Sequence, residues 1–303
     1  ETPVVKSIPY TNKPEEVTPG VANHYASTYY NGQDYVNVLI KTREGRPIFV
    51  KSNTATGVGH ANVRVNASVM GLYDSARLQG PHLAGAGSTW GALDAEVTKA
   101  MSGTGRKVVL TNTVLSPSLQ RTIDTFCQVH GADHVQVDAV SHNALRKAAK
   151  LHAGVDTFPG FDFSAAQTVV TVGADFLGTW GDAAYYESEW VKTRRPENGT
   201  MSKMHAFETV MSLTGTNADM RTMVKPSEQG KVLAALHASI TGQGVAPELD
   251  ERVAAAVKVA ADDLKRAGSA GLVVAGANDV DAQLVVAAIN TALGADGTTV
   301  KYN

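Results

Sequence analysis

The stretch Val169-Val170-Thr171-Val172-Gly173-Ala174-Asp175 decides the fold, because a short run of β-branched apolar residues stands directly before a glycine. Such a run predicts a strand that is buried on both faces and ends at Gly173. Strands of this kind are typical of parallel sheets, in which helices connect neighbouring strands and cover both faces. The flanking sequence should therefore alternate between helices and strands.

The chain beyond Gly91 follows that alternation. Further apolar runs predict strands at 107–110, 135–137, 272–275 and 298–302. The most regular helical pattern spans 249–266, with Leu249, Val253, Val257, Ala260 and Leu264 on one face. The other predicted helices span 92–101, 116–127, 143–151, 185–192, 230–240 and 280–293. We therefore predict an α/β fold with a doubly wound, mostly parallel sheet.

The N-terminal part has a different pattern. Four prolines within residues 1–20 predict an extended arm that lies across a surface. Alternating apolar residues over 35–51, with a turn at 43–46, predict a β-hairpin, and 67–78 predicts a short helix. We expect a small β-rich domain with this arm at 1–80 and an α/β domain at 81–303.

The chain ends directly after the predicted strand 298–302. A strand of a parallel sheet is normally followed by a covering helix. We therefore expect these residues to be the N-terminal piece of a longer polypeptide, with the α/β domain truncated at its C-terminus.

Composition excludes several classes of protein. Hydrophobic residues make up 43% and charged residues 18%, which supports a buried core. The formal net charge of −2 provides no basic field for a nucleic acid. No run of about 18 apolar residues predicts a membrane span. The single cysteine, Cys127, rules out an intrachain disulfide and any cluster held by several cysteines of this chain.

Three groups of polar residues are candidates for a ligand, metal or catalytic site. Asp175 follows a strand end, where ligands bind in doubly wound sheets, but it could equally cap a helix or turn, and we favour the cap. The spacing Cys127-x2-His130-x3-His134 suits a metal, although a buried helix cysteine with two loop histidines is the simpler interpretation. The acidic pairs Asp262-Asp263 and Glu187/Glu189 fit solvated helix faces better than acid–base pairs.

Six strings carry a resemblance to a known family. Together they resemble the molybdopterin-oxidoreductase superfamily, and more narrowly the large iron–sulfur subunit of alternative complex III. The strings are Lys13–Asn23 (KPEEVTPGVAN), Tyr25–Thr28 (YAST), Lys41–Ile48 (KTREGRPI), Gly71–Asp74 (GLYD), Gly173–Trp180 (GADFLGTW) and Ser212–Asp219 (SLTGTNAD). The resemblance covers nearly all 303 residues in order.

The resemblance implies an N-terminal domain that holds a [4Fe–4S] cluster in cofactor-bearing members, through four spaced cysteines. The matching positions here are Tyr29, Gly32, Val36 and Asn62, with gaps of two, three and twenty-five residues. All four thiolates are missing, and cysteine sulfur is what holds iron in such clusters. We therefore expect no cluster at these positions.

The resemblance also places a nucleotide-binding loop after the strand near Val224. In cofactor-bearing relatives a carboxylate of this loop pairs with a guanine, and the matching position here is Gln229. Ser227 stands in place of a glycine, and Glu228 adds a charge that would repel a pyrophosphate. Asp175, Thr179, Asp219 and Gln229 are thus the candidates for a vestigial nucleotide site, and we expect no molybdenum cofactor, no metal and no catalytic residue in this segment.

The function that the resemblance implies is structural. This segment would be a cofactor-free region of the iron–sulfur subunit of a quinol-oxidising respiratory complex. Iron–sulfur clusters would lie in a later part of the subunit. The expected neighbours are a multihaem cytochrome c subunit, integral-membrane subunits and a terminal oxidase, on the periplasmic side of the bacterial cytoplasmic membrane.

Two alternatives stay open at this point. The first is a working molybdopterin oxidoreductase that lacks only its N-terminal cluster, in which Asp175, Thr179 and Asp219 would help to hold the nucleotide. The second is an unrelated α/β enzyme, which an apolar pocket with convergent polar groups would favour.

Overall fold

The structure is a computed structural model that describes Asn12 and residues 14–302. The chain forms two compact units, which are treated separately below. Among the described residues, the smaller unit comprises those up to 31 and 35–77, and the larger one comprises 32–34 and 78–302.

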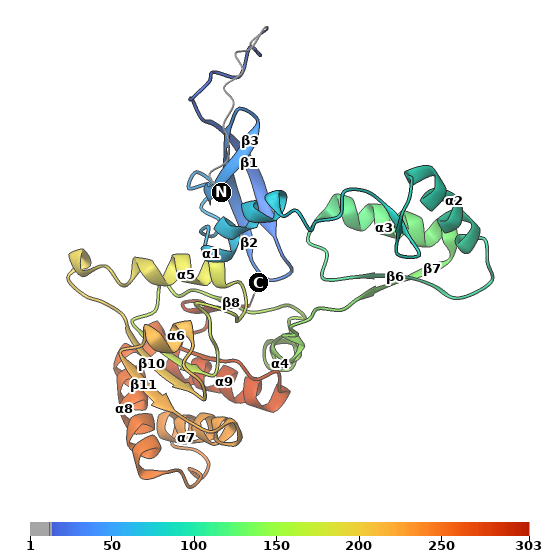
Figure 1. The fold of residues 1–303 in the computed structure, drawn as a ribbon. Helices are drawn as coiled ribbons and strands as arrows, with labels where there is room; N and C mark the ends of the chain where they lie inside the picture. Colours follow the sequence, from blue (N-terminus) through green and yellow to red (C-terminus); the bar gives the residue numbers. More distant parts are fainter. Residues whose placement is uncertain (1–11, 13, 303) are drawn as a thin grey trace. The chain divides into compact units, whose positions relative to one another are not determined.

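The smaller unit is built on an antiparallel three-stranded sheet (Figure 1). Its strands are β1 (Asn23–Tyr30), β2 (Tyr35–Arg43) and β3 (Arg46–Ser52). The predicted hairpin is confirmed, and its turn has positive φ at both Glu44 and Gly45, which matches the right-handed twist of the two strands. The strand β1 was not predicted.

Helical structure follows the sheet. The sequence predicted one helix over 67–78, but the chain forms α1 (Val63–Ala67) and a 3-10 helix, η1 (Ser68–Tyr73). Val65 of α1 is buried, as are Val36, Val38 and Val50 of the sheet. These side chains make up the small core of this unit.

The predicted proline arm is described only in part, because residues 1–11 and 13 lie outside the described residues. Within the described part, the amide of Val17 donates to the Pro14 carbonyl and that of Val21 to the Thr18 carbonyl. This part of the chain therefore makes two tight turns instead of the predicted extended run.

The larger unit contains the predicted parallel sheet, and the α/β fold class is confirmed. Its strands are β9 (Thr168–Val172), β10 (Lys203–Glu208), β11 (Met220–Met223) and β12 (Gly271–Ala275). They pair in parallel in the order β11-β10-β9-β12. Every residue of β9 and β12 is buried, as the apolar runs predicted. The resemblance placed a strand near Val224, where β11 ends, whereas β10 was not predicted.

Two apolar clusters cover the two faces of this sheet. On one face, Val170 and Val273 pack with α7 (Gln229–Thr241), α8 (Glu251–Ala267) and α9 (Val280–Leu293). The helix α8 buries Val253, Val257, Ala260 and Leu264 of the predicted stripe. Leu249, the first residue of that stripe, precedes the helix and packs against the same cluster.

On the opposite face, Val169 and Leu272 pack with aromatic residues that include Trp180 and Trp190. Trp190 belongs to α5 (Ala183–Lys192), and α4 (Asn143–Ala153) packs against α9. The short elements of this unit are α6 (Leu213–Thr216), η2 (Pro196–Asn198), η3 (Pro226–Glu228) and η4 (Gly268–Ala270).

Side chains close the sheet at its β12 edge. Asn290 of α9 accepts a hydrogen bond from the Val273 amide and donates one to the Val273 carbonyl, both at 2.9 Å. Gln283 donates to the Ala275 carbonyl, and Thr299 donates to the Gly271 carbonyl. These groups therefore take the place of a further strand.

The predicted final strand does not join this sheet. The observed strand β13 (Val300–Lys301) pairs antiparallel with β8 (Gly160–Phe161). The prediction for 298–302 was wrong in this respect, because an apolar run indicates a strand and does not identify its neighbour.

The first part of the larger unit forms a separate layer. The strands β6 (Lys107–Thr111) and β7 (Ala132–Gln136) pair in parallel, and α3 (Pro117–His130) connects them. Ser116 caps α3 as predicted, but the helix continues three residues past Cys127, and β7 begins before the predicted 135–137. The helix α2 (Trp90–Met101) and the pair β4 (His82–Leu83) and β5 (Ala86–Gly87) precede this layer.

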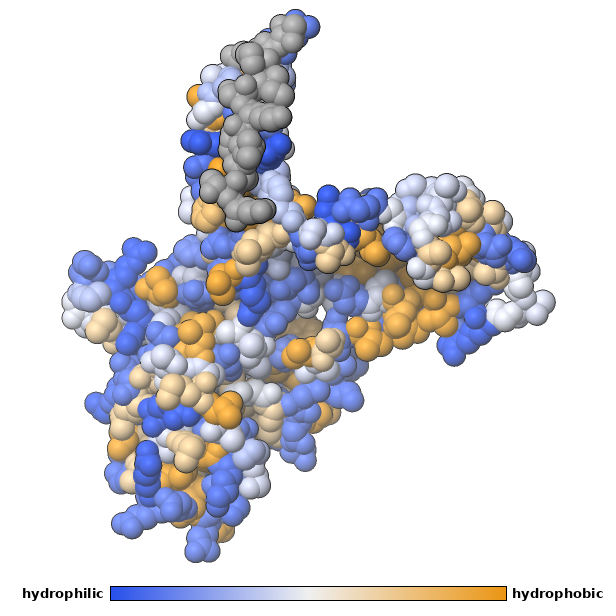
Figure 2. Space-filling model, in the orientation of Figure 1, coloured by the Kyte–Doolittle hydropathy of each residue, from blue (hydrophilic) through white to orange (hydrophobic). Residues whose placement is uncertain are grey.

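This β6–α3–β7 layer exposes many apolar side chains. Val108 and Leu110 alternate on β6 and are 47% and 68% exposed, and Val129 and Val137 are exposed as well. Apolar residues gather on this part of the molecule, at the right of Figure 2. Since parallel strands are normally covered on both faces, this surface is suited to contact with another protein.

Candidate functional site

The carboxyl ends of the four parallel strands form the edge at which doubly wound sheets bind ligands. Gly173 follows β9 with φ of 65°, a conformation that glycine adopts without strain. Its amide donates to the Phe207 carbonyl, and the Gly276 amide donates to that of Val172. The backbones are so close that a Cβ on Gly276 would overlap the Gly173 carbonyl oxygen.

Asp175 lies at this edge and holds a helix in place. Its Oδ1 accepts hydrogen bonds from the amide and the hydroxyl of Thr214, at 2.9 and 2.8 Å. Its Oδ2 accepts one from Thr179 at 3.2 Å. Thr214 stands in the first turn of α6, so Asp175 caps this helix from a distant segment, whereas the favoured interpretation was a cap on the next helix or turn.

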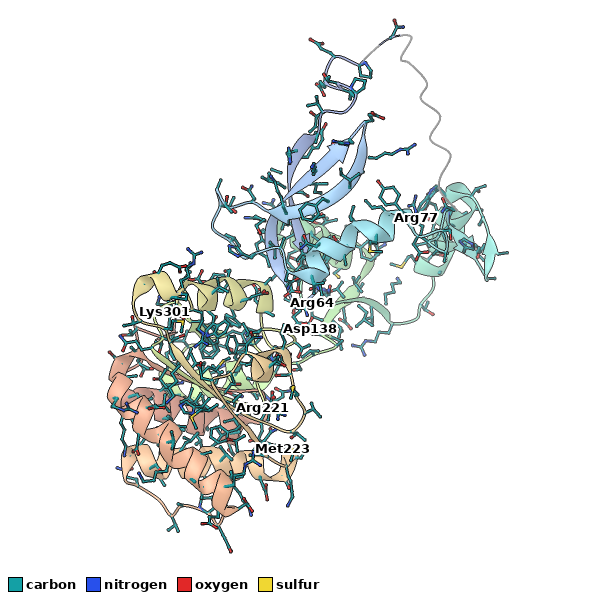
Figure 3. All side chains as sticks on the ribbon, turned by 60° about the vertical axis from the view of Figure 1, so that its left-hand side comes forward. Arg64, Arg77, Asp138, Arg221, Met223 and Lys301 are labelled. Atoms are coloured by element: carbon teal, nitrogen blue, oxygen red, sulfur yellow. The ribbon has the colours of Figure 1, made fainter. Side chains whose placement is uncertain are left out.

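Glu208 is a polar residue of this edge that the sequence analysis missed. It ends β10, is buried, and accepts hydrogen bonds from Ser212 at 2.6 Å and from Arg221 at 2.5 Å. Arg221 lies on the edge strand β11 together with the exposed Met223 (Figure 3). A glutamate directly after apolar residues was the sequence signal for this ion pair.

Gln229 completes the edge. Its side-chain amide lies against Gly173, where a Cβ would stand 2.9 Å from the Gln229 oxygen, and it donates to Thr209 at 3.4 Å. Asp175, Thr179, Glu208 and Gln229 thus bond to groups of this chain. At the position to which the resemblance assigns a carboxylate that pairs with guanine, this chain has the amide of Gln229.

Asp219 lies away from the other candidates. It precedes β11 and accepts hydrogen bonds from the Met204 amide at 2.8 Å and from Arg194 at 2.9 and 3.0 Å. It therefore stands at the amino edge of the sheet, about 13 Å along the strand direction from the carboxyl edge. The structure thus corrects the expectation that Asp219 shares a site with Asp175 and Thr179.

The carboxylate of Asp219 should contribute pH-dependent stability. Burial raises the pKa of Asp219, but the hydrogen bonds from Arg194 and Met204 outweigh it, so the pKa lies below its usual value. A depressed pKa stabilises the folded state above the unfolded pKa of about 3.9, and this contribution is lost as the pH falls through the folded pKa. Asp219→Asn should therefore lower the free energy of unfolding by about 1 kcal/mol at pH 7.

Urea unfolding of both proteins at pH 7, 5 and 3 would check this prediction. The difference between them should persist at pH 5 and shrink at pH 3. A difference that is equal at all three values would contradict a role for the charge.

The four positions that the resemblance matches to cluster cysteines contain ordinary packing and capping groups. Tyr29 of β1 stands opposite Val36 of β2, and Val36 is completely buried. The Oδ1 of Asn62 accepts a hydrogen bond from the Val65 amide and so caps α1. Gly32 is grouped with the larger unit and has φ of 93°. This set offers no sulfur ligand, so it does not fit an iron–sulfur cluster.

The spacing of Cys127, His130 and His134 does not produce a metal site. Cys127 is half-buried on α3, His130 is the last residue of that helix, and His134 lies on β7, bonded to Thr111. Over Asn12 and 14–302, no group of three or more His, Cys, Asp or Glu side chains is arranged to hold a metal ion. Nor does any helix of that part have the length and hydropathy to span a bilayer.

The acidic pairs on the helices were predicted to be solvated, which is wrong for two of the four residues. Asp263 of α8 and Glu189 of α5 have side chains only 4% and 9% exposed. Asp263 accepts hydrogen bonds from Lys203 and His205, and Glu189 accepts one from Lys192. Asp263 follows the buried Ala260 by three residues, so the helical period already placed it beside the core.

Comparison with known proteins gives no match among family models or curated sequences. Acetylene hydratase from Pelobacter acetylenicus is a similar solved structure, with a TM-score of 0.56 and 10% identity over 92% of this chain. The fold resembles that of acetylene hydratase. At this identity the likeness shows the fold alone.

A second solved structure is less similar. It is the formyltransferase/hydrolase complex FhcABCD from Methylorubrum extorquens with methylofuran, at a TM-score of 0.46 and 17% identity over 68% of this chain. Such a score does not indicate a shared fold. This chain spans 43% of the acetylene hydratase chain and 56% of the second one.

Proposed function

We propose that this chain is a cofactor-free structural region of the iron–sulfur subunit of alternative complex III, a quinol-oxidising respiratory complex. The six strings of sequence suggest that family. The distant likeness to acetylene hydratase, a molybdopterin enzyme, is consistent with membership of the superfamily. It gives no support for alternative complex III in particular. The proposal places this chain on the periplasmic side of the membrane, in contact with a multihaem cytochrome c and integral-membrane subunits.

One observation carries the proposal. The four positions that match cluster cysteines hold Tyr29, Gly32, Val36 and Asn62, and a completely buried valine occupies one of them. In this proposal the chain keeps the spacing of the four positions and the fold, but it lacks the cysteines that would hold the cluster. A structural role accounts for that combination.

The exposed apolar layer supports a role in assembly. Val108 and Leu110 on β6 and Val129 on α3 are apolar side chains in water, and apolar surfaces of this kind mark contacts with other proteins. Partner subunits would cover them.

The alternatives find less support in the geometry. A working molybdopterin site would need Asp219 near Asp175 and Thr179, and these residues stand at opposite edges of the sheet. An unrelated enzyme would favour an apolar pocket, whereas the large pocket of this unit is lined mainly by polar residues and lies at the amino edge.

The test is purification of the full subunit from its native membranes through an affinity tag. We expect co-purification of haem-c-bearing protein and less than about 0.1 molybdenum atom per chain, since Ser227 and Gln229 replace the glycine and the carboxylate that the resemblance assigns to cofactor-bearing relatives. Molybdenum would be measured by mass spectrometry and the pterin by fluorescence after oxidation. Stoichiometric molybdenum, or a subunit that purifies without haem protein, would overturn the proposal.

A further inference from the structure

A second potential site lies at the amino edge of the parallel sheet. A pocket of about 560 Å³ opens there, between the beginnings of β9 and β10 and the last turns of α5 and α8. It is on the opposite edge from the candidate nucleotide site. Its size falls within the range of small-molecule sites.

A buried carboxylate organises one wall of this pocket. The side chain of Asp263 is 4% exposed and accepts hydrogen bonds from Lys203 Nζ at 2.6 Å, from His205 Nε2 at 2.7 Å and from Arg266. Burial lowers the pKa of His205 more than Asp263 raises it, so His205 is neutral at pH 7. The carboxylate of Asp263 thus pairs with two cations, Lys203 and Arg266.

The cations retain donors for a ligand. An ammonium has three N–H donors and a guanidinium has five. Lys203 and Arg266 therefore keep N–H groups that do not bond to Asp263. Their side chains are 42% and 75% exposed. Lys192 also lines the pocket, 55% exposed and paired with Glu189, which is not among the lining residues. The ionic side chains of the lining are therefore three cations and one carboxylate.

Helix ends explain only part of this charge. Lys192 and Arg266 stand in the last turns of α5 and α8, where positive side chains complement the negative pole of a helix. Lys203 begins the strand β10, so no helix end accounts for it. Its position over Asp263 places a third cation at the same opening.

Neutral polar groups also line the pocket. The Thr193 hydroxyl donates to the Trp190 carbonyl and lies 2.8 Å from the Ser202 hydroxyl, so both hydroxyls are engaged within the wall. Asn198 also lines the pocket, and its amide donates to the Lys192 carbonyl, which holds this wall together. The donors left for a phosphate oxygen are therefore the N–H groups of the two lysines and the arginine, which are charge-assisted donors.

We propose that this pocket binds a phosphoryl group, either as inorganic phosphate or as the phosphate of a small monoester. Three cations face two carboxylates, Asp263 and the Glu189 that pairs with Lys192, so a net positive charge and the remaining N–H donors of the cations favour an anion. The volume exceeds that of phosphate and leaves room for the organic part of an ester. This inference does not depend on the proposed function.

Isothermal titration of the purified protein with inorganic phosphate and with glycerol 3-phosphate, at constant ionic strength, tests this site. We expect saturable binding with a Kd between about 0.1 and 10 mM. Arg266→Gln and Lys192→Gln should each raise the Kd at least about fivefold, because each removes one cation from the lining. Tighter binding of the ester than of phosphate would identify the ester as the natural ligand, and the reverse would identify the free ion.

Lys258→Gln is the matched control. Lys258 also lies on α8 and also pairs with an aspartate, Asp262, but it does not line the pocket. This variant should leave the Kd within about twofold. Equal weakening by all three variants, or no saturable binding up to about 20 mM of either compound, would overturn the proposal. Hydrogen exchange should show protection at 193–203 and 263–267, and protection confined to other segments would refute this location.

Discussion

Gly276→Ala should lower the free energy of unfolding of the larger unit by about 3–5 kcal/mol. The added Cβ would overlap the carbonyl oxygen of Gly173, and a backbone atom cannot rotate away as a side chain can. The strands β9 and β12 would have to separate at their carboxyl ends. That separation would strain the hydrogen bond from the Gly276 amide to the Val172 carbonyl, which is 3.0 Å long.

Urea unfolding followed by tryptophan fluorescence measures this effect, because Trp180 and Trp190 are buried in the core of this unit. Gly230→Ala is the matched control. Gly230 lies in α7 with nothing within 4 Å of its potential Cβ. Alanine at this position should therefore raise the free energy of unfolding by up to about 1 kcal/mol. If both variants unfold at the same urea concentration, the close approach of the two strands does not limit which residue position 276 can hold.

Asn290→Leu should destabilise the same unit by about 2–6 kcal/mol, because it strips the hydrogen bonds from two buried backbone groups. The side chain of Asn290 is 1% exposed and satisfies both the amide and the carbonyl of Val273. Leucine has nearly the same size but can replace neither hydrogen bond. No water can reach the completely buried Val273 to compensate.

Asn217→Leu provides the comparison for this substitution. Asn217 also donates a hydrogen bond to a carbonyl, that of Leu213, but it is exposed, so water can replace the lost contact. A loss below about 1 kcal/mol is expected there. A small loss for Asn290→Leu, measured by the same fluorescence transition, would show that another group satisfies the β12 edge.

Local patterns were sufficient for much of the architecture. The strands over 169–172 and 272–275 and the α8 stripe appeared in the sequence because all of their residues are apolar or follow the helical period. The hairpin turn at Glu44 and Gly45 was equally visible. In each case a few neighbouring residues carry the whole signal.

The missed strand β10 shows where such patterns fail. Its sequence, KMHAFE, mixes charged with apolar residues, although five of its six residues are buried. His205 is satisfied by Asp263, fifty-eight positions away, and Glu208 by Arg221 on the next strand. A polar residue can be buried only when such a partner exists, and no local window contains it.

The candidate site divides in the same way. The absence of cluster ligands followed directly from residue identity, since Tyr29, Gly32, Val36 and Asn62 carry no thiolate. The separation of Asp219 from Asp175 could not be predicted in this way. Asp175 follows a strand and Asp219 precedes one, and a sequence alone does not show at which edge of the sheet each strand end lies. The structure alone assigns them to opposite edges.

Residue types and their short-range periodicity were enough to predict a layered α/β structure and to show that the chain has a single cysteine, too few for the four thiolates of a [4Fe–4S] site. Which strand borders which, which carboxylates are buried, and where Lys192, Lys203 and Arg266 converge were decided by the tertiary structure. The physical reason is range: propensity and ligand chemistry reside in single residues and their neighbours, whereas burial of a polar group depends on partners brought together only by folding.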